Sequence, residues 1–187
     1  GFFAARLIAR FPDLPVEEEG RLSDPRLREN FVERVFAYRR LRDLFGGRWN
    51  LGALVEFHTA HKLILMAHSP EAYQRLGRFV ARARAVPKKD IESRYTGMFM
   101  AALSVVATPR RHTNVLQHMA GYFKDQLDRE STAELAAAIE DYRRELVPLV
   151  VPITLVRHHV RVHNVAYLAG QRYLEPHPKE LMLRNHV

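Results

Sequence analysis

The segment Glu56 to Lys62, EFHTAHK, carries two histidines and a lysine that could bind a metal or a phosphate. His58, His61 and Lys62 fall on one side of a predicted helix whose other positions are mostly apolar. Polar groups on such a buried helix must be paired inside the protein or must face a cleft. A His-x-x-His pair can ligate a metal, but the sequence shows no third ligand and no HExxH motif, so we assign no metal site. Core histidines with internal partners are the first interpretation, and a cluster that faces phosphate is the second.

A second polar group lies in the segment TPRRHTNVLQHMAGYFK, from Thr108 to Lys124. One narrow stripe of this predicted helix carries Arg110, Asn114, Gln117, Gly121 and Lys124. We expect Thr108 to cap the helix, which puts Arg110 and Arg111 in its first turn, where the helix dipole disfavours cations. A bound anion would remove this conflict, because helix amino ends and guanidinium groups both coordinate phosphate. The alternative is an ordinary solvated helix face.

A third group lies in RHHVRVHN, where Arg157, Arg161 and Asn164 follow one another at i, i+4 and i+7. Arg172 would extend this line if the helix continued. No carboxylate is near in sequence to neutralise these cations, so the stripe suits a polyanion better than a self-paired surface. Three tyrosines could add rings that stack on bases, although the core is the default place for such rings: Tyr122, Tyr167 and Tyr173.

The composition supports a polyanionic partner. The 187 residues include 29 Lys and Arg against 21 Asp and Glu, which gives a formal net charge of +8 and a pI of about 10.1. Only five of the cationic residues are lysines. Arginine has a planar fork that matches phosphate, although a bias towards arginine can also arise without any function.

The residue types also limit the chemistry. Cysteine is absent, which excludes disulfides, thiolate nucleophiles and Cys-ligated clusters in this chain. No GxSxG motif, Gly-rich phosphate loop or spaced carboxylate pair names a nucleophile or a base, so we expect this chain not to be an enzyme. No apolar run reaches the ~18–20 residues of a membrane span, and the amino end has no signal-peptide pattern. We therefore expect a cytoplasmic protein without a membrane partner.

Helical patterns with capping residues follow one another along the chain. Asp24-Pro25 begins a long helix that Gly46-Gly47 ends, with an expected apolar stripe of Leu27, Phe31, Val35, Tyr38 and Leu41. Further helices are expected over residues 50–67, 69–86 and 88–107, from 108, from Ser131 with Glu134 as a capping box to about 146, and from about 152. The prediction is an all-α, compact single-domain bundle of about six to eight helices with an extended C-terminal tail that packs back on the domain.

Three long segments resemble the YbgA-like domain. They are FHTAHKLILMAHSPEAYQRLG from Phe57, NVLQHMAGYFK from Asn114 and YLAGQRYLEPHPKELMLRNH from Tyr167. The segment LPVEEEGRLSDPRLRENFVERVF, from Leu14, resembles the junction at which that domain follows a thiouracil-desulfidase domain. We therefore expect residues 1–22 to be the remnant of a preceding domain and a linker, and residues 23–187 to be a helical YbgA-like domain.

The resemblance implies a function on tRNA. Such fused proteins are expected to remove sulfur from 4-thiouridine in tRNA, at an iron–sulfur cluster held by cysteines of the desulfidase domain. The YbgA-like part would bind the tRNA. Because this chain has no cysteine, we expect no cofactor in it and place the cluster only in the desulfidase domain.

The sequence thus predicts an accessory domain that presents tRNA to a fused or partner desulfidase domain, through a basic surface that recognises phosphate and shape. The family motif does not name the contacting residues, so the candidates come from the stripes: His58, His61, Lys62, Arg110, Arg111, Asn114, Gln117, Lys124, Arg157, Arg161 and Arg172. The alternative is a protein-interaction or dimerisation module without direct RNA contact.

Overall fold

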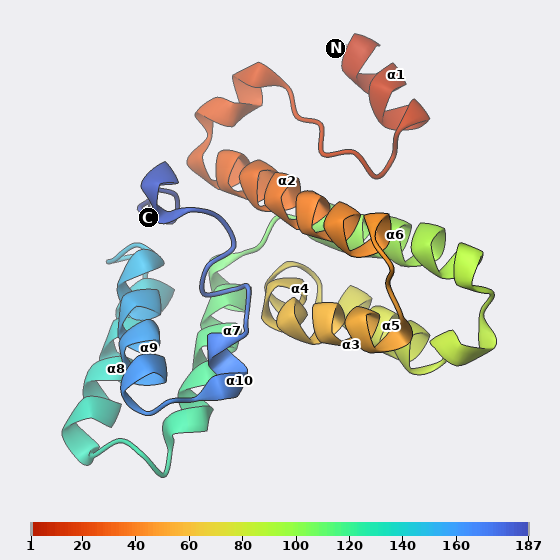
Figure 1. Cartoon of the computed structure of the whole chain (residues 1–187). Coiled ribbons are helices and arrows are strands. Elements are labelled where there is room, and N and C mark those ends of the chain that lie inside the picture. The colour runs from red at the N-terminus through yellow and green to blue at the C-terminus, as the bar shows by residue number, and fades with distance from the viewer. Residues whose placement is uncertain (1, 187) are drawn as a thin grey trace.

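The computed structural model describes residues 2–186, which are helical in most of their length and contain no strand (Figure 1). The all-helical prediction is confirmed. Gly1 and Val187, at the ends of the two predicted segments, lie outside the described residues. The α-helices are α1 (Phe2–Arg10), α2 (Pro25–Gly46), α3 (Leu51–Ala60), α4 (Lys62–His68), α5 (Pro70–Ala81), α6 (Lys88–Ser104), α7 (Pro109–Ala120), α8 (Arg129–Arg143), α9 (Val150–Val162) and α10 (Ala166–Ala169). Short 3-10 helices are η1 (Glu19–Ser23), η2 (Ala83–Ala85), η3 (Gly121–Phe123) and η4 (Lys179–Leu181).

Capping side chains begin most helices where the sequence predicts. The side chains of Asp24, Asn50, Ser69 and Thr108 each accept a hydrogen bond from a backbone N–H of the helix that follows. The capping box predicted at Ser131 is wrong, because Asp128 caps α8 by accepting from the backbone N–H of Ser131 at 2.7 Å.

The helix expected over residues 50–67 is divided into α3 and α4 at His61. The division exposes backbone groups that the C-terminal segment binds. The backbone N–H of Arg172 donates to the carbonyl of Ala60 at 2.8 Å, and the side chain of Gln171 donates to the carbonyl of Thr59 at 2.9 Å. These partners lie more than 100 residues away in sequence, so no local pattern predicts the break.

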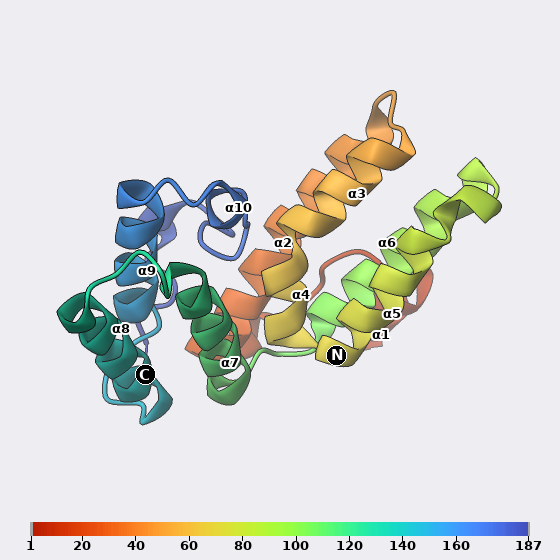
Figure 2. The ribbon, with the colours of Figure 1, turned by 90° about the horizontal axis from the view of Figure 1, so that it is seen from below.

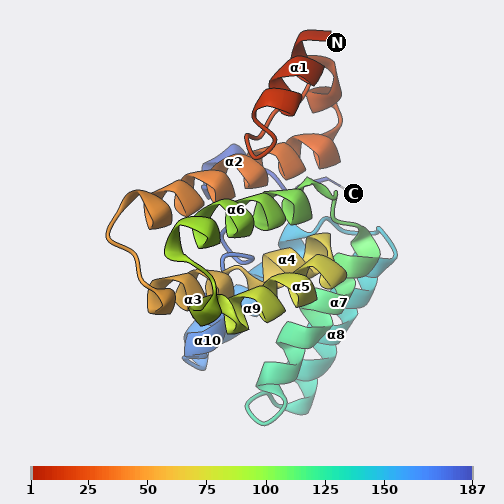
Figure 3. The same cartoon turned by 90° about the vertical axis from the view of Figure 1, so that its right-hand side faces the viewer.

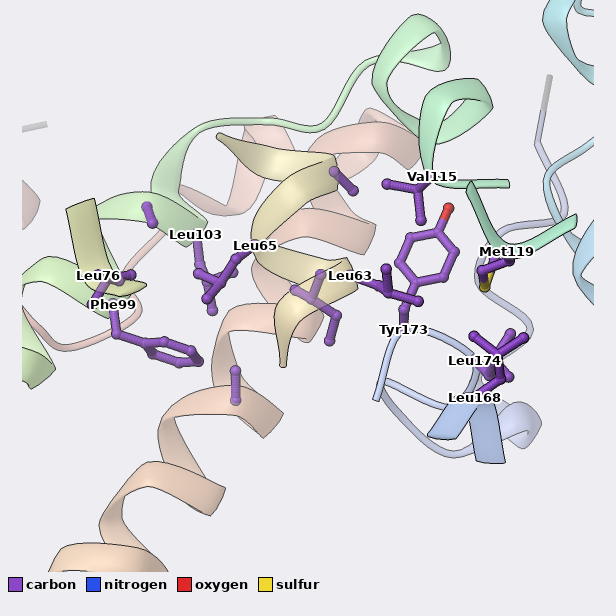
Figure 4. Close-up of a cluster of buried hydrophobic side chains, with 14 of the residues drawn as sticks. Leu63, Leu65, Leu76, Phe99, Leu103, Val115, Met119, Leu168, Tyr173 and Leu174 are labelled. Carbon is purple, nitrogen blue, oxygen red and sulfur yellow. The ribbon is translucent and has the colours of Figure 1, made fainter. Parts of the chain in front are cut away.

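The helix α4 lies at the centre of the fold, between two groups of helices (Figure 2). Helices α2, α3, α5 and α6 form one group, and α7, α8 and α9 form the other, whereas α1 stands at one edge (Figure 3). Leu63 and Leu65 of α4 are fully buried, and apolar side chains of both groups gather around them, including Leu103 of α6 and Met119 of α7 (Figure 4). No helix among the described residues combines the length and apolar character needed to cross a membrane.

The face of α2 that turns inwards differs from the predicted stripe. Val35 is 39% exposed, whereas the carboxylates of Glu29 and Glu33 are buried. The reason lies in the C-terminal tail, where buried Arg184 donates from Nε to Glu29 at 3.0 Å and from Nη2 to Glu33. His68 bonds the second oxygen of Glu33 through Nε2 at 3.0 Å. The buried face of α2 therefore carries charge in its first half, whereas Leu41 of the predicted stripe is buried as expected.

This buried ionic cluster shifts the pKa of its members. Burial by itself would raise the pKa of Glu33, but Arg184 and then His68 outweigh it and hold that pKa well below the usual range. Burial raises the pKa of Glu29 to about 7, against the attraction of Arg184. Burial would lower the pKa of Arg184, but Glu33 and Glu29 raise it. The arginine therefore stays charged and holds the tail on α2.

Replacing Arg184 with methionine leaves two buried carboxylates without their main partner. Breaking a buried ion pair typically costs about 3–5 kcal/mol, so R184M is expected to lower the free energy of unfolding by this amount. Urea denaturation at pH 7 measures it. The control R143M removes an exposed pair with Glu140 and is expected to change the free energy of unfolding far less than R184M does. Equal stability of the two variants would contradict a structural role for the cluster.

Candidate nucleic-acid interface

A reversal of the chain after α9 brings the third group of predicted residues together. The helix ends at Val162, and Asn164 adopts a left-handed backbone conformation with φ of 53°. The backbone N–H of Val165 then returns to the carbonyl of Val160 at 3.1 Å, and α10 runs beside α9. Arg172 therefore reaches the same region as Arg157 and Arg161 because the chain turns back, not because the helix continues.

A cleft of about 960 Å³ lies between α9 and the chain from α10 onwards. We call it the α9–α10 cleft. Its polar lining comes from both walls: Thr154, Arg157, His158, Arg161, Asn164, Gln171, Arg172 and Glu175. Glu175 is the one carboxylate among its lining residues, and it pairs with Arg157. The side chains of Arg161 and Arg172 are exposed and form no hydrogen bond or ion pair with the described part of the chain.

Arg40 places further positive charge near Arg172. Arg40 is half-buried, and its Nη2 donates to the carbonyl of Pro176 at 2.7 Å, whereas its buried Nη1 has no partner among the described residues. Burial lowers the pKa of Arg40, and the neighbouring Arg172 lowers it further. Two guanidinium groups in proximity repel each other, so an anion at this wall of the cleft would be stabilised by both.

The first group of predicted residues divides into core and surface. His58 and His61 are buried, and His58 bonds the hydroxyl of Tyr95 at 3.1 Å. His61 binds the carbonyl of Phe57 through Nδ1 at 2.8 Å. Burial lowers the pKa of both, to about 3 for His61, so both are neutral at physiological pH. Their place in the core agrees with the first interpretation, except that the buried Nε2 of His61 has no partner among the described residues, and Lys62 is left as the accessible cation.

On α7, the two adjacent arginines have different surroundings. Arg110 and Asn114 are exposed, and Arg110 has no partner within the described range. Arg111 is half-buried and donates from Nη1 to the carbonyl of His68 at 2.9 Å. This carbonyl is at the negative end of α4, where a cation is favourable. The conflict expected at the amino end of α7 is thus relieved for Arg111 by the protein itself.

The remaining predicted residues of α7 belong to another surface. Gln117 and Lys124 line a groove of about 240 Å³ between α7 and α8, which we call the α7–α8 groove. Most of its other lining is apolar: Ala120, Phe123, Leu127, Leu135, Ala136 and Ile139. The ammonium of Lys124 is 4.0 Å from the carboxylate of Asp125. The predicted residues Gln117 and Lys124 of α7 and the predicted arginines of α9 therefore line different hollows.

Two stacked tyrosine rings, one of them on α10, form a further feature of this region. Tyr122 and Tyr167 have ring centres 5.2 Å apart and planes 16° apart. Tyr173, which the sequence offers as a third stacking ring, is fully buried, and its hydroxyl bonds Nδ1 of His112 at 2.8 Å. Sequence reasoning also missed the buried carboxylates of α2, because their partner Arg184 lies about 150 residues away. No three side chains of the types that bind metals group together in the part of the chain described.

Residues 62–178 match the family described as "Protein of unknown function (DUF1722)". The match spans more than half of the sequence. The chain belongs to the DUF1722 family. It is similar to the "Uncharacterized protein YbgA" of Escherichia coli (strain K12), with 37% identity over 161 residues that cover 86% of this chain and 95% of that protein. The predicted YbgA-like domain is thereby confirmed, and the DUF1722 match includes the whole lining of the α9–α10 cleft. No solved structure matches.

The neighbouring residues Arg110 and Arg111 offer a test of which cations are free to bind a ligand. R111A removes a bond from a charged donor to the end of α4 and is expected to lower the free energy of unfolding by about 1.5–3 kcal/mol. R110A is expected to change it by less than about 0.5 kcal/mol, as for an ordinary surface position. Urea denaturation of both variants measures the difference. If R110A lowered the free energy of unfolding strongly and R111A left it unchanged, Arg111 rather than Arg110 would be the free cation.

Proposed function

We propose that this chain is a tRNA-binding accessory domain that presents tRNA to a 4-thiouridine desulfidase domain, fused or separate. The observation that carries the proposal is the α9–α10 cleft, where Arg157, Arg161 and Arg172 lie together with a single carboxylate, Glu175. Arg161 and Arg172 lack an anionic partner in the described residues, although they line a cleft large enough for part of a nucleic-acid strand.

The physical argument rests on charge and exposure. Guanidinium groups bind phosphate oxygens through paired N–H donors, and each phosphate contact releases counterions from the RNA. Arg40 lies close enough to Arg172 for the two charges to repel each other, so its charge adds to the positive potential near this wall of the cleft. A phosphate between these groups would relieve their mutual repulsion. Recognition of this kind reads backbone and shape rather than base sequence.

The choice of tRNA as the RNA comes from the resemblance of residues 14–36 to the junction with a desulfidase domain. The proposed division of labour is binding by this chain and sulfur removal by a cluster on the desulfidase domain, so no cofactor is proposed here. The side chains of the cleft position a backbone, and none of them acts as a nucleophile in the proposal. The expected place of this activity is the cytoplasm.

A second candidate function is supported by the α7–α8 groove. Apolar side chains of Phe123, Leu127, Leu135 and Ile139 line it, with Glu140 and Lys124 also in its lining. Grooves of this type accept apolar side chains of a partner protein, so a docking role towards the desulfidase domain or a second copy is the alternative. The two functions use different surfaces, which allows them to be tested separately.

Removing the two unpaired arginines of the cleft tests the main proposal. In R161Q/R172Q, the affinity for tRNA is expected to fall, and the slope of log K against log salt to decrease by about 2, since each lost phosphate contact reduces it by about 1. A filter-binding or fluorescence-anisotropy titration from low to moderate salt measures both quantities.

The matched control is R82Q/R84Q, which removes two exposed cations near the far end of α5 (Figure 1). Its affinity and salt slope are expected to remain those of the wild type. Equal losses in both double variants would show that net charge, not the cleft, is responsible. If the wild type binds no tRNA at low salt but forms dimers in ultracentrifugation, the second candidate replaces the first.

A further inference from the structure

One side of helix α10 lines the cleft, and another side makes contacts of a different kind. Ala166, Ala169 and Gly170 line the α9–α10 cleft, whereas Tyr167 stacks on Tyr122 of η3. The intervening Leu168 is fully buried and anchors the turn. The stacked rings and the basic cleft therefore share the short helix α10, which the buried Leu168 holds on the core.

We call the stacked rings of Tyr122 and Tyr167 the tyrosine platform. Tyr122 is 37% exposed, and Tyr167 is half-buried. The next residue after Tyr122 is Phe123, which is 1% exposed and fixes the backbone of η3. His118 lies edge-on to Tyr122, with ring centres 5.6 Å apart. The platform is thus a pair of nearly parallel rings, of which Tyr122 is the more exposed.

A cation accompanies the platform. The ammonium of Lys62 is 5.8 Å from the ring centre of Tyr167. It also lies close enough to Tyr122 and His118 to lower the pKa of both, although burial is the larger influence on each, raising that of Tyr122 and lowering that of His118. Lys62 makes no ion pair within the described residues. The site therefore combines a π-surface with a free positive charge, as proteins that bind single-stranded nucleic acid do.

Tyr173 provides a comparison, because its ring belongs to the core. Tyr173 has no exposed surface, and its hydroxyl forms a hydrogen bond with Nδ1 of His112. Tyr122, in contrast, leaves more than a third of its surface open beside a basic cleft. Exposing a large aromatic side chain to water is unfavourable, and a stacking ligand would remove that exposure.

We infer that the tyrosine platform stacks on an unpaired nucleobase of an RNA whose backbone lies in the α9–α10 cleft, with Lys62 near the adjoining phosphate. This inference rests on the proposed function and adds the class of RNA that the site prefers. The bases of a continuous A-form helix are hidden in its stack, whereas loops and bulges offer bases that aromatic side chains can hold. The preference is for unpaired over paired RNA and is tolerant of base identity.

Two RNA hairpins of equal length and charge test the inference. In one, a central 2-aminopurine pairs with uridine; in the other, it lies in an internal loop. The wild type is expected to bind the looped hairpin about tenfold more tightly, because stacking contributes about 1–3 kcal/mol per base. Binding is also expected to quench the fluorescence of the looped 2-aminopurine. Y122A is expected to lose the preference and the quenching, while its affinity for the paired hairpin and its salt dependence stay unchanged.

The controls separate stacking from folding. Y122F and Y167F keep a ring and are expected to retain the preference, and circular dichroism checks that Y122A keeps its helix content. Equal affinity of the wild type for the two hairpins, or an unchanged preference in Y122A, overturns the platform but leaves the cleft as an RNA site. Absence of binding to either hairpin at low salt overturns both the platform and the proposed function.

Discussion

The buried charge of Arg184 is the constraint on which the arrangement of the chain depends. A guanidinium group that is removed from solvent needs anionic partners, and α2 provides these partners in Glu29 and Glu33. This pairing ties the C-terminal tail to a helix about 150 residues earlier. The same arginine donates to the carbonyl of Tyr173 at 2.7 Å, so the segment after α10 is held by the same group. The wall of the cleft that carries Arg172 is thus fixed indirectly by a salt bridge in the core.

The break between α3 and α4 completes that attachment. A continuous helix would consume the carbonyls of Thr59 and Ala60 in its own hydrogen bonds. Because α3 ends there, these carbonyls accept from Gln171 and from the backbone of Arg172 instead. The hydrogen bonds lost within the helix are replaced by hydrogen bonds between distant parts of the chain. These bonds determine the position of Arg172. Buried polar groups therefore organise the surface that we propose to bind RNA.

The proposed interface has two components with different physics. The α9–α10 cleft attracts phosphate over a distance and weakens with salt, whereas the tyrosine platform acts only at contact and is insensitive to screening. Placed on two sides of α10, they would distinguish an RNA with exposed bases from a regular duplex. Such a division suits a domain that holds a folded RNA for chemistry carried out elsewhere. The apolar α7–α8 groove remains available for a protein neighbour.

The sequence by itself determined the helical class, most helix starts and the basic character, because periodicity, capping residues and charge are local properties. It also placed Arg157 and Arg161 on one face of α9. Only the tertiary structure decided that Arg172 joins them, that Arg111 is engaged with α4, and that His58 and His61 lie in the core. Each of these outcomes depends on a partner far away in the chain. Helical spacing shows which residues share a face, whereas packing alone decides whether that face meets water, a ligand or another helix.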